Sequence, residues 1–146
     1  MDREQTKPHV LYICKNNYSE HLFRRVLGES FHVTYCSTLP SEVLPLLSKH
    51  TFALVLLECS DVYDTENSGD STTTERGWDI AEMDREILTM KPRTVNSATP
   101  ILVAMTFDDG PLADQVRRLG ATRVFRKVDF SPKTVVEAIR KEIGAP

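Results

Sequence analysis

Several side chains that can do chemistry follow directly after short apolar runs of the sequence. They are a thiol, a carboxylate, a hydroxyl and two ammonium groups, on Cys14, Glu58, Thr106, Lys15 and Lys127. A carboxylate held between two ammonium groups forms an ion-pair cluster whose net stability depends on its burial. A thiolate is a nucleophile and a ligand for soft metals. Which chemistry is available depends on whether the fold brings these side chains together.

The apolar runs that precede these side chains predict β-strands. There are five, each short and β-prone, at 10–13, 33–36, 52–57, 101–105 and 123–125. The third and fourth are almost continuously apolar, which is typical of a sheet covered on both faces. Helical patterns separate the runs, so strand and helix alternate five times. This alternation predicts an α/β fold with a doubly wound, five-stranded parallel sheet.

Start and stop signals place several of the helices. Ser131 followed by Pro132 predicts the beginning of the last helix, and Gly120 the end of the helix before it. Apolar residues at helical spacing from Ile80 to Met90 predict the third helix. Residues 61–76 are polar, acidic and rich in Ser and Thr. We therefore expect a mobile surface insertion there, without core residues.

The carboxyl ends of the strands form the functional edge of a doubly wound sheet. All five reactive side chains follow predicted strands, so we expect them at this edge.

Length and composition are those of one globular domain. The chain has 146 residues, 40% of them hydrophobic and 27% charged, which predicts a single domain over residues 1–146. No apolar run approaches the roughly 18 residues of a membrane span, and the polar N-terminus lacks the apolar core of a signal peptide. We therefore expect a cytoplasmic protein with no membrane partner.

Charge is distributed unevenly, although the total is only −3. Residues 59–88 hold nine acids and two bases, a net charge of −7, whereas residues 115–146 hold eight bases and three acids, a net charge of +5. The total does not favour a nucleic-acid partner. The placement fits either two solvated faces or an electrostatically steered protein surface.

Four segments, taken in order, resemble parts of a response-regulator receiver domain. HVLYICKNNYSEHLFRRVL resembles the family's first strand and helix, FALVLLECSD its phospho-accepting strand, PILVAMT its fourth strand, and GATRVFRKVDFSP the segment with its lysine. The resemblance covers nearly the whole chain. It implies a flavodoxin-like (βα)5 fold of strand order 2-1-3-4-5, metal-assisted phosphoryl transfer to a carboxylate, and a role in phosphorelay or two-component signalling. Lys127 matches the family's lysine, and Thr106 matches its hydroxyl residue after a shift of one position.

The chain departs from this family pattern at the positions that carry the chemistry. Cys14 and Lys15 replace the acidic pair, and Glu58, one methylene longer, replaces the acceptor aspartate. Val128 replaces the proline after the lysine, and Val124 an aromatic residue. We therefore expect a pseudo-receiver that is not conventionally phosphorylated, binds no metal such as Mg²⁺, is not an enzyme and acts as a protein-interaction module.

One hypothesis assigns Lys15 the place of the missing metal, between Glu58 and Lys127. Such a cluster would hold the domain in one state without phosphate. The alternative is that Lys15 extends to solvent and Glu58 only caps the end of a strand.

Receivers of this family dock or dimerise through the fourth helix, the fifth strand and the fifth helix. In this chain the surface would carry Arg117, Arg118, Arg123 and Arg126. We expect it to bind a signalling protein with an acidic surface, or the acidic region 61–86 of a second copy.

Three other interpretations remain open. The first is a receiver that is phosphorylated on unusual residues. The second rests on VLYICKNNYSEHLF, which is similar to the start of a low-molecular-weight tyrosine phosphatase with Cys14 as nucleophile; Glu20 stands where the arginine would, and it would repel phosphate. The third is a redox switch or soft-metal site of Cys14, Cys36 and Cys59, which otherwise are inert apolar side chains.

Overall fold

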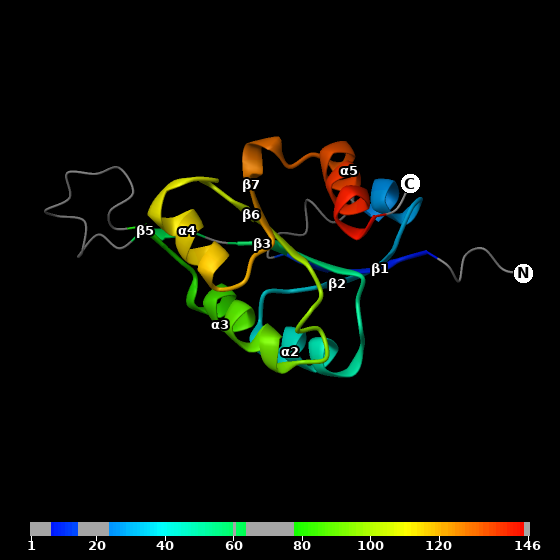
Figure 1. The fold of residues 1–146 in the computed structure, drawn as a ribbon, viewed down its shortest axis with the longest axis horizontal. Helices are drawn as coiled ribbons and strands as arrows, with labels where there is room; N and C mark the ends of the chain where they lie inside the picture. Colours follow the sequence, from blue (N-terminus) through cyan, green and yellow to red (C-terminus); the bar gives the residue numbers. More distant parts are fainter. Residues whose placement is uncertain (1–6, 15–23, 60, 64–77, 145–146) are drawn as a thin grey trace, which may run out of the picture.

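A parallel sheet of five strands organises the chain, as predicted (Figure 1). The computed structural model describes residues 7–14, 24–59, 61–63 and 78–144. The strands lie in the order β2-β1-β3-β6-β7, with the bounds β1 (His9–Ile13), β2 (His32–Cys36), β3 (Leu54–Glu58), β6 (Ile101–Met105) and β7 (Arg123–Arg126). Numbered among themselves, this is the order 2-1-3-4-5, so the predicted fold class is confirmed.

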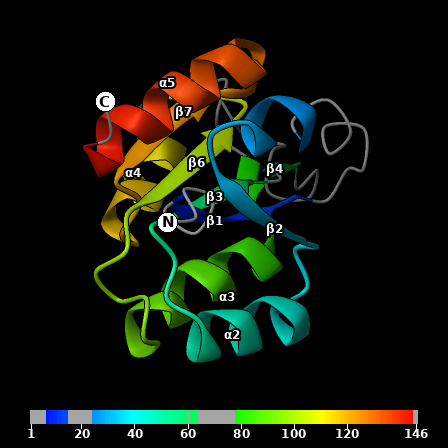
Figure 2. The same cartoon turned by 90° about the vertical axis from the view of Figure 1, so that its right-hand side faces the viewer.

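Helices cover both faces of the sheet. The three helices α2 (Pro40–Lys49), α3 (Glu82–Met90) and α4 (Gly110–Arg118) contribute to one buried cluster. Helix α5 (Pro132–Ile143) and the helical residues 24–28 contribute to a second cluster. Figure 2 shows α5 above the sheet and α2 and α3 below it. None of the described helices is long and apolar enough to cross a membrane.

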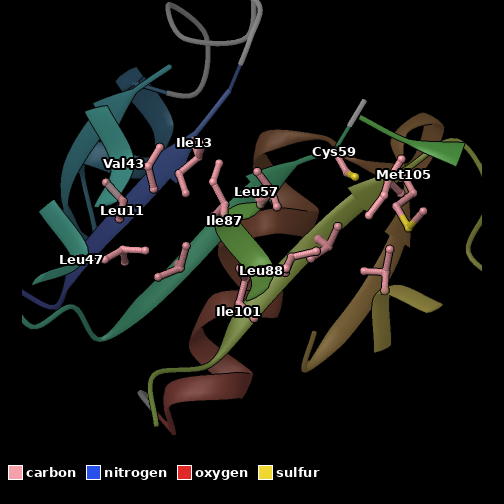
Figure 3. Packing of buried hydrophobic residues seen from close by; sticks show 14 of the residues in the cluster. Leu11, Ile13, Val43, Leu47, Leu57, Cys59, Ile87, Leu88, Ile101 and Met105 are labelled. Carbon is pink, nitrogen blue, oxygen red and sulfur yellow. The ribbon is translucent and has the colours of Figure 1, made fainter. Parts of the chain in front are cut away.

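Alternation along the strands divides the core into these two clusters. Leu11 and Ile13 of β1 face the α2–α4 side, whereas Val10 and Tyr12 face the α5 side. Figure 3 shows the α2–α4 cluster, in which aliphatic side chains of the strands and helices interdigitate. The inner strands are buried on both faces, which explains why their sequences are almost continuously apolar.

The last helix begins where the sequence predicts. The Ser131 side chain accepts a hydrogen bond from the Thr134 backbone N–H, and the Ser131 N–H donates to the Thr134 hydroxyl. This reciprocal cap satisfies donors that the first helical turn leaves open. Helix α5 therefore starts at a defined position in the segment that follows β7.

The expected insertion at 61–76 begins in a short strand. Two short strands, β4 (Asp61–Tyr63) and β5 (Trp78–Ile80), pair antiparallel in a separate two-stranded sheet. Ile80 therefore lies in a strand rather than in the third helix. Three-residue strands are too short to produce a periodic pattern, although Val62 and Trp78 favour strands. Residues 64–77 lie outside the described residues.

Candidate functional site

Parallel pairing brings the predicted site residues to one edge of the sheet. Glu58 ends β3, and Cys14 follows β1, whose register with β3 pairs Ile13 with Leu57. Cys14 is therefore the neighbour of Glu58 across the two strands. Thr106 follows β6 directly, and Lys127 follows β7. Lys15 lies outside the described residues.

Glu58 accepts a hydrogen bond from a residue that the sequence did not single out. The Tyr12 hydroxyl donates to Glu58 Oε2 at 2.6 Å. Tyr12 is fully buried and Glu58 is half-buried, so this bond to a carboxylate is poorly exposed to competing water. Tyr12 stands in an apolar run and is easily taken for core. Its hydroxyl is the feature of the sequence that could have indicated a role at the site, because a buried tyrosine needs a hydrogen-bond partner.

An aromatic cluster holds the Tyr12 ring in place. The Tyr35 ring lies 5.6 Å from it and the Phe130 ring 6.5 Å, measured between centroids. The Arg24 guanidinium lies 4.8 Å from the centroid of the Tyr35 ring, within the range of a cation–π contact. The hydroxyl that binds Glu58 is thus carried by a ring packed among other rings.

Of the hypothesised cluster of Glu58, Lys15 and Lys127, the structure describes Glu58 and Lys127. Lys127 is exposed and begins a 3-10 turn, η3 (Lys127–Asp129). Among the described residues, the ion pairs do not include one between Lys127 and Glu58. Lys127 is the first residue of this turn, and the Glu58 carboxylate accepts a hydrogen bond from Tyr12 rather than pairing with the lysine. Thr106 is exposed as well.

The three cysteines do not form one site. Cys14 and Cys59 are buried in different clusters, on opposite faces of the sheet. Cys36 packs against the same cluster as Cys59. Burial first, and then the nearby Cys14 and Glu42, raise the pKa of the Cys36 thiol to about 12. A thiol with this pKa is neutral near pH 7, so it is a weak nucleophile and a weak metal ligand.

The described part of the edge does not suit a magnesium ion. Magnesium prefers carboxylate and other oxygen ligands. A buried thiol, that of Cys14, stands beside Glu58. The described residues contain no group of three or more His, Cys, Asp or Glu side chains arranged to hold a metal.

The predicted partner surface, formed by α4, β7 and α5, is exposed, but most of its arginines form ion pairs within the chain. All four of its arginines are exposed. Three of them meet carboxylates of the same chain: Arg117 with Asp114 (3.2 Å), Arg123 with Glu142 (3.0 Å) and Arg126 with Asp129 (3.2 Å). Arg118 forms no ion pair with any described residue. Of the four arginines, Arg118 is therefore the one whose charge is not already paired with a described carboxylate.

Comparisons with known proteins agree on the fold. The chain is similar to a receiver domain protein (CheY-like) from Methanospirillum hungatei JF-1, with 13% identity, a TM-score of 0.70 and 94% of each chain covered. It is also similar to the receiver domain of a histidine kinase from Syntrophus aciditrophicus, with 11% identity, a TM-score of 0.69, and 94% of this chain and 90% of the other covered.

A third similar structure holds a metal. It is the receiver domain of a sensor histidine kinase from Pseudomonas aeruginosa PAO1, with a magnesium ion coordinated in its active site cleft. It shares 14% identity with this chain at a TM-score of 0.65, over 95% of this chain and 99% of the other. No family model matches the sequence, and no curated protein matches it. The chain therefore has the fold of response-regulator receiver domains.

Proposed function

We propose that this chain is an atypical receiver domain of two-component-type signalling, which works in the cytoplasm as a protein-interaction module. In this proposal the chain is not an enzyme, and it neither accepts a phosphoryl group at Glu58 nor requires Mg²⁺. One observation carries the proposal: the carboxylate at the acceptor position is bound by the buried Tyr12 hydroxyl at 2.6 Å.

Phosphoryl transfer to a carboxylate depends on positioning and on cations that neutralise the transferred group. At this edge one carboxylate oxygen is engaged by Tyr12, and the neighbouring position holds the thiol of Cys14, which is only 6% exposed. The low exposure also argues against Cys14 as a phosphatase nucleophile, because a reactive thiolate needs access to its substrate. Both facts support a domain that keeps the fold and has lost the reaction.

Acetyl phosphate tests this part of the proposal. After incubation with acetyl phosphate and Mg²⁺, intact-mass analysis is expected to show no adduct of one phosphoryl group on the wild type. Glu58→Gln is the control, because an adduct that persists in this variant lies at another residue. Tyr12→Phe removes the hydrogen bond and keeps the ring, so an adduct at Glu58 in this variant alone would identify the bond as the block. An adduct at Glu58 in the wild type would contradict the proposal.

The interaction role rests on the surface of α4, β7 and α5. The partner would be an acidic surface, either of another signalling protein or of the acidic region 61–86 in a second copy. Arg118 is the best-placed contact, since no carboxylate among the described residues competes for it. The paired Arg117 contributes less, because Asp114 and the backbone oxygen of Asp108 already occupy its guanidinium.

Charge reversal distinguishes this surface from general electrostatics. Arg118→Glu is expected to abolish binding of the acidic partner, or self-association in sedimentation velocity at low salt. Arg25→Glu makes the same change of net charge at an exposed position among the helical residues 24–28, and it should leave binding intact. Equal loss in both variants would assign the effect to net charge and contradict the role of the surface.

A further inference from the structure

A cavity of about 90 Å³ lies between α5 and the sheet. Its walls are carbon-rich and come from three strands, η3 and α5, with the side chains Leu56, Leu102, Phe125, Phe130, Val135 and Ala138. Leu56, Leu102 and Val135 are buried, and the other three are half-buried.

The polar groups at the rim are already engaged. The Asp129 carboxylate accepts from Arg126 Nε at 3.2 Å. The Thr134 hydroxyl donates to backbone oxygens of Asp129 and Ser131 and accepts from the Ser131 N–H. A water molecule inside the cavity would find few partners, because buried water needs two to four polar neighbours. A charged ligand would lose its hydration without gaining a free counter-charge.

The rim opens the cavity to solvent. Asp129 and Thr134 are exposed, whereas the deepest wall residues, Leu56 and Leu102, are at most 1% exposed. Apolar cavities of about 150 Å³ stay dry and bind benzene. A somewhat smaller cavity with an open rim can hold one ring and need not enclose it completely.

We propose that this cavity beneath α5 is a binding site for a small, uncharged, apolar molecule with a single aromatic ring. The occupant would pack against Phe125 and Phe130, since aromatic rings favour edge-to-face or offset contacts with other rings. The site adjoins the carboxyl edge through Phe130, whose ring also meets that of Tyr12. It is independent of the phosphorylation state proposed for Glu58.

Benzene and benzoate are the probes for a test on the wild-type chain by methyl NMR. Benzene is expected to give saturable shifts at the methyl groups of Leu56, Leu102 and Val135, and none at Leu47, which belongs to the other cluster. Benzoate has the same ring with a charge and should give no saturable shift. The proposal would be overturned if benzene gave no saturable shift, or if benzoate saturated as benzene does. Equal shifts at Leu47 would overturn it as well.

A matched pair of variants on α5 tests the location. Ala138→Leu fills the cavity from the helix and is expected to weaken benzene binding by roughly tenfold or more. Glu137→Leu adds a leucine to the exposed face of the same helix and should bind benzene as the wild type does. Benzene binding that survives Ala138→Leu would overturn the proposal. Should Ala138→Leu fail to fold, the ¹²⁹Xe shift of xenon with the wild type decides: a saturable shift supports the site, and a linear one refutes it.

Discussion

Replacement of Asn96 by alanine is expected to destabilise the protein more than any surface substitution. The Asn96 side chain is fully buried at the end of the molecule opposite the candidate site. Its Oδ1 accepts from the Phe52 N–H (2.8 Å) and the Thr99 hydroxyl (3.0 Å), and its Nδ2 donates to the oxygens of Leu47 (2.7 Å) and His50 (2.6 Å). One amide thus joins the end of α2, the entry to β3 and the segment before β6, and both of its ends are fully used.

The size of the effect follows from the groups that alanine would leave without a partner. The bonds to the Phe52 N–H and the Leu47 carbonyl are buried, and each orphaned group costs about 1–3 kcal/mol. The His50 bond is only partly buried, so water can replace it. The expected loss of unfolding free energy is therefore about 4 kcal/mol, a large share of the roughly 5–15 kcal/mol of an ordinary domain.

Urea denaturation followed by far-UV circular dichroism measures this loss. Asn96→Asp keeps an acceptor but places a charge against two carbonyl oxygens, so it should be at least as destabilising. Ser97→Ala is the neighbouring control, since Ser97 is exposed, and its effect should stay within about 0.5 kcal/mol. A loss below about 1 kcal/mol for Asn96→Ala, at an unchanged denaturant slope, would refute the reasoning.

Two further predictions concern pH and backbone conformation. Burial, and then the nearby His32 and His50, lower the pKa of His9 below its usual value of 6.5. The unfolded chain therefore binds more protons than the folded one, so this contribution to stability is present above about pH 6.5 and is lost as the pH falls below it. In urea titrations at several pH values, His9→Gln should flatten the dependence of the unfolding free energy on pH. An unchanged dependence would count against this prediction. Gly120 has φ +117°, a conformation that alanine adopts with strain, so Gly120→Ala should lower the unfolding free energy by about 1–2 kcal/mol. Gly28 lies in a helix, and an added carbon there would meet no neighbouring atom within 4 Å, so Gly28→Ala should raise the unfolding free energy by about 0.5–1 kcal/mol. Melting temperatures that shift in the same direction for both variants would contradict this contrast.

Local pattern was sufficient for most of the fold. The strand at 101–105 was predicted with the bounds that the structure has, and the beginning of α5 follows from Ser131 and Pro132. Both depend on neighbours in sequence, through burial on both faces of a strand or the open donors of a first helical turn. The pairing of β4 with β5 was missed, because three residues carry too little pattern and the partner strand lies beyond residue 76.

The candidate site could be predicted only in position. Strand ends placed Cys14, Glu58, Thr106 and Lys127 at one edge, since parallel strands share their direction. Which side chains meet there was beyond the sequence: Lys127 is exposed on a 3-10 turn, and Tyr12 binds Glu58. Three of the four predicted partner arginines likewise turned out to be paired within the chain.

The sequence by itself determined the alternation of strands and helices, the cap of α5 and the edge where polar residues gather. These features depend on the periods of helix and strand, which any short stretch of chain expresses. Only the tertiary structure decided the contacts of Glu58 with Tyr12 and of Asn96 with Leu47, which join residues 46 and 49 positions apart. Such pairs depend on strand register and on how side chains fill the space between elements, and neither is a property of a local pattern.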